Sequence, residues 1–409
     1  MSSTVRAPGG QGRPVTMRDV ARAVGVTQST VSRILNNAPL AVPVAPQTRE
    51  RVLEAARRLG YRPNPMARAL RGAPTMLLGA IVRDITDLFF AGAIEAVSTA
   101  ARQRGYNVVL GHAHGRATEA FVLAAMLEAR QCDALLVLGD MRDQPSLIED
   151  LRASSVPVVA LWQGSELHGI CSVNVDNAAG IVSAIGHLRD LGHRRIAFLG
   201  GRPLGDIRER QRAFVDSFNK GELPRGYVRH VANSPSDGAA ALQALMRLRA
   251  SPTAIVASTD VLAAGVLHGA AALGMRVPDD LSVVGFDDIS IAPYLVPALT
   301  TVRMPTAAMA EAAVSLAVQM ASVEGQERSP QVRLFRPELV VRASTAPPPT
   351  SVSTRPRNAS GRASHEMDAT GVVDAAAQEF PEGSRHPRDP QSVDPAPSTY
   401  GTARVEQVE

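Results

Sequence analysis

The chain has 409 residues, of which 45% are hydrophobic and 20% are charged, so it can bury a sizeable core and is long enough for two or three domains. This composition excludes a fibre and a fully disordered chain. The net charge of +4 hides an asymmetry: residues 13–72 hold eleven arginines and three acids, for +8, while residues 73–349 sum to −2 and residues 350–409 to −3. Such a basic segment indicates a polyanionic partner, and nucleic acid is the usual one.

The sequence lacks the patterns of a disulfide scaffold, a metal site or a membrane protein. Cys132 and Cys171 are too few for a disulfide framework and have no metal-ligand spacing, so we interpret both as packed thiols. The first residues lack the apolar core of a signal peptide, and no run approaches the roughly 18 apolar residues that a membrane span needs. These features predict a cytoplasmic protein without a metal or a cofactor.

Composition divides the chain into four regions. Residues 1–14 are rich in Gly, Pro and Ser and are expected to be disordered, and residues 15–72 are basic and helical. Within the second region we expect a domain at 15–62 and a hinge and linker at 63–74. Residues 75–346 alternate short β-rich apolar runs with Ala/Leu-rich stretches, a pattern typical of parallel α/β units. We expect two open sheets there, with a ligand cleft beyond the carboxyl ends of their strands. Residues 347–409 are rich in Pro, Ser, Asp and Glu, which predicts disorder.

The basic domain begins with the pattern of two short helices joined by a tight turn. Thr16 can cap a first helix with Asp19 at its third position, a capping-box arrangement that also places a carboxylate at the positive helix end. Val20 and Val24 share one face of that helix, and Gly25 permits the turn. A second helix from about Thr27 would then bury its apolar positions, which are Val31, Ile34 and Leu35.

The opposite face of the second helix is polar. It presents Gln28, Ser29, Ser32 and Arg33, whose side chains are of the types that hydrogen-bond base edges and phosphates in a major groove. The pattern favours a helix-turn-helix. An ordinary helical hairpin with a solvated face stays open as an alternative on spacing alone.

These residues resemble the DNA-binding domain of the lactose/galactose-repressor (LacI/GalR) family, over VTMRDVARAVGVTQSTVSRILNN and TRERVLEAARRLGYRPNPMARALRG. The resemblance implies a recognition helix with Gln28 and Ser29 at its two main base-reading positions. It also implies a third helix from about Pro46 to Leu59. The DNA contacts that it assigns come from Thr16, Thr27, Gln28, Ser29, Ser32, Arg33, Asn36, Arg49, Asn64, Ala67 and Leu70.

The resemblance further implies a hinge helix at Asn64–Arg71 that forms on the operator, with Leu70 inserted between base pairs from the minor groove. Such a wedge unstacks a base step and kinks the duplex. Alone, Leu70 could equally be a core leucine, but its segment is too short to be a stable helix without a partner. The loop at 38–46 is longer than the family pattern, and Ala45 stands where a Ser or Thr usually caps the third helix, with Pro46 as partial compensation.

The resemblance continues from Leu77 to about Thr345, through landmarks such as SVNVDNAAGIVSAIGHLRDLGHRRIAFLGG and SVVGFDDI. It implies two α/β lobes of the periplasmic sugar-binding fold, joined by crossing strands. The effector positions that it assigns are Asp87, Phe89, Phe90, Trp162, Arg210, Thr259, Asp260 and Asp287. Arginine and carboxylates suit hydroxyl groups, and an aromatic face suits a sugar ring. Thr259 and Arg83 depart from the family pattern, which leaves the ligand open.

Other chemistry finds little support in the sequence. His112 and His114 could be a metal pair, but they lack a third ligand and fit a loop or cleft rim better. GGRPLG lacks the Lys-Ser/Thr ending of a phosphate loop, and no nucleophile motif such as G-x-S-x-G occurs. We therefore expect no catalytic residues.

The sequence thus predicts an α/β protein with a helix-turn-helix head and a two-lobed body resembling periplasmic binding proteins. We expect a homodimeric transcriptional regulator, a repressor, that binds a palindromic DNA operator under the control of a small-molecule effector, a sugar. A regulator that responds to a purine or another co-repressor is the main alternative. A solute-binding protein would need a signal peptide and no basic head, and an α/β enzyme would need a catalytic constellation.

Overall fold

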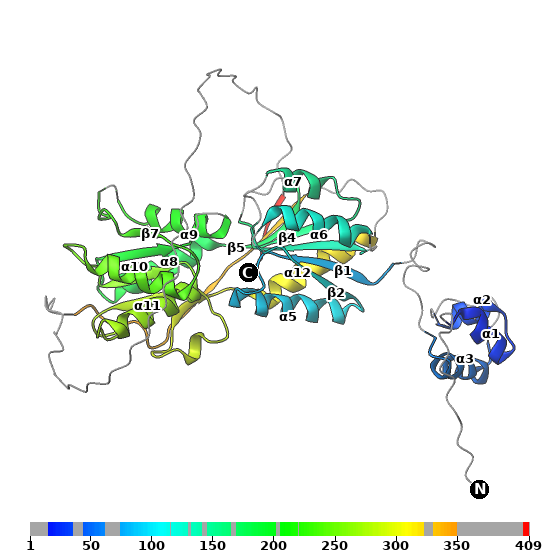
Figure 1. Ribbon diagram of the computed structural model, residues 1–409. Coiled ribbons are helices and arrows are strands. Elements are labelled where there is room, and N and C mark those ends of the chain that lie inside the picture. The colour runs from blue at the N-terminus through cyan, green and yellow to red at the C-terminus, as the bar shows by residue number, and fades with distance from the viewer. Residues whose placement is uncertain are drawn as a thin grey trace, which may run out of the picture. The chain divides into compact units, whose positions relative to one another are not determined.

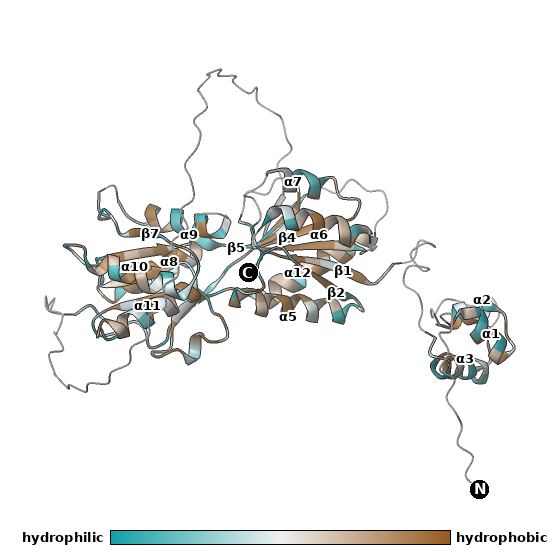
Figure 2. Ribbon diagram, viewed as in Figure 1, coloured by the Kyte–Doolittle hydropathy of each residue, from teal (hydrophilic) through white to brown (hydrophobic). Residues whose placement is uncertain are grey.

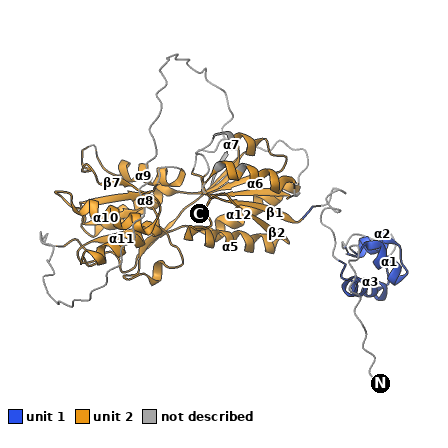
Figure 3. Ribbon diagram, viewed as in Figure 1, with its two compact units in different colours: residues 1–75 blue, residues 76–409 orange. Residues whose placement is uncertain are grey.

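The computed structural model describes residues 15–35, 44–61, 74–114, 116–129, 132–140, 145–164, 169–201, 205–219, 221–322, 330–349 and 404–408. Two compact units divide the chain, residues 1–75 and residues 76–409 (Figure 3). We call them the head and the body. Among the described helices, none is both long and apolar enough to cross a membrane.

The head is a three-helix unit built around one small apolar core. Its helices are α1 (Met17–Val24), α2 (Gln28–Leu35) and α3 (Pro46–Arg58). The expected capping arrangement is present, because the Asp19 carboxylate accepts hydrogen bonds from the backbone N–H of Thr16 at 2.9 Å and from its hydroxyl at 2.7 Å. Gly25 ends α1 with φ of 74°, the left-handed conformation that glycine tolerates best. Ala45 gives α3 no side-chain cap, as expected, and Pro46 occupies the first turn.

The body contains two sheets with helices packed against them (Figure 1). The first sheet has the order β13-β11-β5-β4-β3-β1-β2. Its strands are β1 (Leu77–Val82), β2 (Asn107–His112), β3 (Ala134–Leu138), β4 (Val158–Leu161), β5 (Cys171–Val175), β11 (Gln331–Phe335) and β13 (Arg404–Val408). Every described pairing in this sheet is parallel. With α5 (Leu88–Gln103), α6 (Ala117–Ala129), α7 (Pro145–Arg152) and α12 (Thr306–Ser322), it forms lobe 1.

The second sheet has the order β12-β10-β9-β8-β6-β7 and forms lobe 2. Its strands are β6 (Ile196–Gly200), β7 (Val228–His230), β8 (Ala254–Ala257), β9 (Ser282–Asp287), β10 (Thr300–Arg303) and β12 (Glu338–Val340). The helices of this lobe are α8 (Asn177–Asp190), α9 (Gly205–Asp216), α10 (Pro235–Met246), α11 (Asp260–Ala272) and the short η1 (Ala292–Tyr294). Only β12 runs antiparallel, against β10.

The described chain crosses between the lobes three times: after β5, after β10 and after β11. These crossings confirm the expected two-lobed α/β architecture with connecting strands. Central strands such as β3 and β4 are buried at every position and read as continuous apolar runs, visible as brown ribbon in Figure 2.

One part of the C-terminal tail differs from the expectation of disorder over residues 347–409. Residues 404–408 form β13, which pairs in parallel with β11 at the edge of the first sheet. An edge strand presents unpaired N–H and C=O groups, which any extended segment can satisfy, and RVEQV carries no proline that would prevent pairing. Residues 350–403 lie outside the described part of the chain.

Helices α10 and α11 approach closely because both carry glycine at the contact. A Cβ atom at Gly265 would overlap the carbonyl oxygen of Pro235, and one at Gly238 would overlap that of Leu262. Gly265→Ala must therefore push the two helices apart, and we expect a loss of about 1–3 kcal/mol in the free energy of unfolding of the body. Urea denaturation measures this loss.

A matched control is available at Gly186 in α8, where an added Cβ would meet no atom within 4 Å. Gly186→Ala should leave stability unchanged or raise it by about 0.5–1 kcal/mol, because alanine favours the helix. Equal effects of the two substitutions would contradict the close packing of α10 on α11.

Candidate functional site

The head exposes the polar face of α2. Gln28, Ser29 and Arg33 are exposed, while Val31 and Ile34 on the opposite face are almost completely buried. Thr27 precedes the helix, and its hydroxyl accepts the backbone N–H of Thr30 at 3.2 Å, so this side chain caps α2. A helix held on one face by the core and exposed on the other can enter a DNA groove without unfolding.

The other predicted DNA contacts fall into two groups. Ser32 is partly buried, Arg49 is exposed on α3, and the Thr16 hydroxyl is hydrogen-bonded to Asp19. The remaining four lie outside the described residues: Asn36, Asn64, Ala67 and Leu70. The hinge segment at 63–74, which contains three of them, is described only at its last residue.

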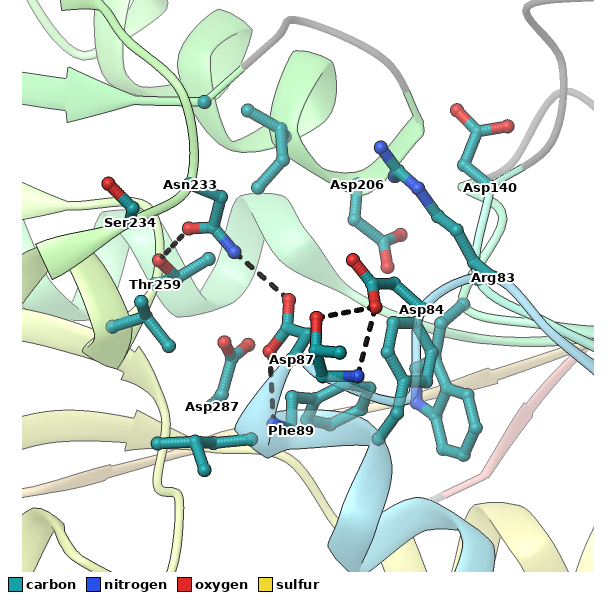
Figure 4. Close-up of a pocket in the computed structure, with 18 of the residues that line it drawn as sticks. Arg83, Asp84, Asp87, Phe89, Asp140, Asp206, Asn233, Ser234, Thr259 and Asp287 are labelled. Atoms are coloured by element: carbon teal, nitrogen blue, oxygen red, sulfur yellow. Dashed lines mark hydrogen bonds between the residues drawn. The ribbon is translucent and has the colours of Figure 1, made fainter. Parts of the chain in front are cut away.

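The body contains a pocket of about 510 Å³ lined from both lobes. Seven of the eight residues that the sequence assigns to the effector line it: Asp87, Phe89, Phe90, Trp162, Arg210, Thr259 and Asp287. Figure 4 shows Asp87 and Asp287 directed toward the same space from different elements. The structure therefore brings together residues that are up to 200 positions apart in the sequence.

Aromatic rings form the lobe 1 side of the pocket. Asp87 caps α5 by accepting the backbone N–H of Phe89 at 3.1 Å, which fixes the start of the helix that carries both phenylalanines. The rings of Phe89 and Trp162 meet edge to face with centroids 5.2 Å apart. Trp162 is 3% exposed, has a left-handed φ of 56°, and its indole nitrogen has no hydrogen-bond partner among the described residues. Such backbone strain and an unsatisfied buried donor are typical of binding sites.

Arg210 forms the floor of the pocket with Asp287, and both side chains are buried. The guanidinium of Arg210 donates to the Asp287 carboxylate at 3.0 Å, to the carbonyl of Ser258 at 2.6 Å and to the Asn177 side chain at 2.8 Å. It also lies 3.6 Å from the centroid of the Phe286 ring. Burial raises the pKa of Asp287 well above its ordinary value, although Arg210 opposes this shift.

Asp260 is the one assigned effector residue that does not line the pocket. Its carboxylate is completely buried and accepts hydrogen bonds from the Thr301 hydroxyl and from the backbone N–H of Ile289. It therefore ties α11 to β10 and to the loop after β9. The reason lies in helix geometry, because Asp260 follows the N-cap Thr259 and its side chain is directed at Thr301 and Ile289 inside lobe 2 instead of toward the cleft.

The pocket also holds residues that the sequence did not reveal. Asp206 lies one helical turn before Arg210 on α9, and the i, i+4 spacing could have indicated it. Asn233 donates to the Asp87 carboxylate at 3.0 Å and accepts from the Thr259 hydroxyl at 2.7 Å, so it joins the two lobes across the pocket. Asn233 stands in a loop without any motif, and no sequence signal could have identified it.

The buried Asp260 generates a prediction about pH. Burial raises the pKa of Asp260 to about 7, whereas in the unfolded chain the carboxyl keeps its ordinary value. The folded protein thus binds this proton more tightly than the unfolded chain. The stability that the proton contributes is complete below about pH 4 and is lost as the pH rises to 7.

In Asp260→Asn this titration is absent. The melting temperature of the variant relative to that of wild type should therefore rise between pH 4 and pH 7 and stay level above pH 7. Thermal melts in a pH series measure the difference. A constant offset across the whole range would contradict a raised pKa at Asp260.

Comparisons with known proteins agree with these two sites. Residues 16–64 match the bacterial regulatory proteins of the lacI family, and residues 185–345 match the periplasmic binding protein-like domain. The transcriptional regulator GalS of Salmonella typhimurium is 34% identical over 337 residues, which cover 81% of this chain and 97% of GalS. Catabolite control protein A of Priestia megaterium is 33% identical over 297 residues, covering 71% of this chain and 88% of that protein.

Solved structures lead to the same family. The lac repressor dimer bound to operator and the anti-inducer ONPF has a TM-score of 0.73 at 26% identity, covering 82% of this chain and 100% of that one. The complex of the transcriptional regulator CelR with cellobiose has a TM-score of 0.58 at 28% identity, covering 81% and 100%. The chain therefore belongs to the lacI family of bacterial regulatory proteins and is a DNA-binding transcriptional regulator controlled by a small-molecule effector.

Proposed function

We propose that this regulator is a repressor that binds a palindromic operator as a homodimer, with a sugar-like effector in the pocket between its lobes. The proposal that the head binds DNA rests on α2. The polar face of this helix is exposed, while its apolar face packs into the core of the head. Two heads related by twofold symmetry would read two half-sites of matching symmetry. We assign base readout to Gln28, Ser29 and Arg33, and the minor-groove wedge to Leu70.

The effector part is supported by the chemistry of the pocket. Hydroxyl-bearing ligands need directional hydrogen-bonding groups, which Asp87, Asn233 and Thr259 supply, and a ring needs an apolar face, which Phe89 and Trp162 supply. A structural relative was solved in complex with the disaccharide cellobiose. An effector that fits one arrangement of the lobes better than another would shift their equilibrium, and with it the operator affinity.

The dimer is supported by an exposed apolar turn in lobe 2. Tyr294, the last residue of η1, and Val296 expose 83% and 93% of their surface, which is unusual for two neighbouring large apolar side chains of a monomer. A relative of known structure is a dimer on its operator. We propose that this turn packs against a second copy of the chain.

Gln28→Ala tests the reading of the operator. The loss of one side chain at a base edge should weaken binding to the operator by about tenfold, while binding to unrelated DNA of the same length should hardly change. Electrophoretic mobility shift assays on both DNAs measure the two affinities, after genomic mapping has identified an operator.

The matched control for this experiment is Gln47→Ala on α3, which removes an equally exposed glutamine from a helix that we assign no base readout. It should bind both DNAs like wild type. If Gln47→Ala lowers operator affinity as much as Gln28→Ala does, α2 is not the reading helix.

Val296→Asp tests the dimer. A charge at this position would be buried against the partner without a counterion, so the variant should be monomeric at concentrations where wild type is a dimer. It should also lose most of its operator affinity, because the two heads are no longer linked. Light scattering coupled to size exclusion gives the mass, and Val182→Asp on α8, at a valine 56% exposed, is the control that should remain dimeric.

A further inference from the structure

The pocket carries more negative than positive charge among the residues that line it. Two arginines line it, Arg83 and Arg210, against five aspartates. Lobe 1 contributes three of the aspartates and lobe 2 contributes two, so like charges face each other across the space that a ligand would fill. The five are Asp84, Asp87, Asp140, Asp206 and Asp287.

Four of these carboxylates lie inside the pocket, two from each lobe. In the view of Figure 4, Asp287 of β9 lies beside Asp87, the N-cap of α5, and Asp206 of α9 lies beside Asp84, while Asp140 lies at the edge. Burial raises the pKa of Asp287, and Asp87 raises it further from the opposite lobe. Burial likewise raises the pKa of Asp206, with Asp140 of lobe 1 contributing. The aspartates of one lobe thus disfavour ionisation of those of the other.

The arginine at the floor does not compensate for this excess toward a ligand. Arg210 is 3% exposed. Its Nε and Nη1 donate to Asn177, Ser258 and Asp287, its Nη2 lies 3.6 Å from the Met304 sulfur, and its guanidinium lies against the Phe286 ring. An anionic ligand would have to displace one of these partners and would meet the facing aspartates. A phosphate or carboxylate group is therefore a poor fit for the middle of the pocket.

Independent features of the same pocket suit a ligand that carries both a cationic group and hydroxyl groups. The ring faces of Phe89 and Trp162 attract cations through their quadrupoles, most strongly at a tryptophan. The unpartnered indole N–H of Trp162, almost completely buried, is a donor for a hydroxyl group. No group of three or more potential metal ligands occurs among the described residues, which argues for an organic cation instead of a metal ion.

We propose that the effector carries a protonated amine as well as hydroxyl groups, and that the amine lies between the aspartates of the two lobes. This inference rests on the proposed effector function and names the chemical class: amino sugars and aminated polyols. The amine would neutralise charge on both lobes at once. It would thereby stabilise their approach, which an uncharged sugar of the same shape cannot do.

The experiment compares related sugars that carry a positive charge, no charge or a negative charge. The full-length protein is melted with glucosamine, glucose, N-acetylglucosamine and glucose 6-phosphate, and with galactosamine and galactose, at a pH where the amines are protonated. Titration of the shift in melting temperature gives an apparent Kd for each compound. We expect at least one amino sugar to bind about tenfold or more tightly than its neutral partner.

Three variants connect the preference to the carboxylates. Asp206→Asn and Asp87→Asn should each reduce the amine-to-neutral ratio to below about threefold, because asparagine keeps the hydrogen bonds and the cap of α5 but not the charge. Asp216→Asn, on α9 outside the pocket, removes an exposed carboxylate and should leave the ratio unchanged. Equal losses in all three would show a general charge effect and would overturn the assignment.

Two further outcomes distinguish this proposal from the function on which it rests. If a neutral sugar or glucose 6-phosphate binds as tightly as the amino sugars or more tightly, the site is an effector site but the cationic class is wrong. If no compound of the panel changes the melting temperature, the proposed sugar effector and this proposal both fail. Operator binding by the head, measured separately, is unaffected by either result.

Discussion

The buried ion pair between Arg210 and Asp287 is the interaction on which the ligand-binding body depends. Two charges removed from water are tolerated only when their remaining hydrogen-bonding groups are satisfied. The partners of Arg210 come from three elements, because Asn177 begins α8, Ser258 follows β8 and Asp287 ends β9. One guanidinium thus holds the carboxyl ends of lobe 2 in register.

Above that floor, Phe89 of lobe 1 packs against the apolar core of lobe 2, and aspartates of the two lobes face each other across the pocket. Asn233 bridges the lobes by contacting Asp87 of lobe 1 and Thr259 of lobe 2. Asp206 and Asp287 face lobe 1 with carboxylates whose pKa values burial has raised. Three connections join the lobes in the described chain. A ligand that neutralises these aspartates would bind more tightly when the lobes are close together than when they are apart. Such a difference in affinity is what an effector needs in order to change the operator affinity of a regulator.

The head follows a simpler physical logic. Its core consists of short aliphatic side chains such as Val20, Val31 and Val52, each completely buried. Because these residues occupy one face of each helix, the remaining faces are free for arginines and polar groups. The helix-turn-helix and the ligand pocket therefore lie in two different compact units of the chain. The segment between residues 61 and 74 joins them in the chain.

The sequence by itself determined the helices of the head, the strands of the two lobes and most of the pocket. Helix caps, the glycine turn and the apolar periods are local signals, and the family resemblance supplied the register for Arg210 among its neighbouring arginines. Only the tertiary structure decided the role of Asp260, the bridge formed by Asn233 and the strand formed by the C-terminal residues. Each depends on which groups meet from distant parts of the chain, and no local pattern of residues encodes such a meeting.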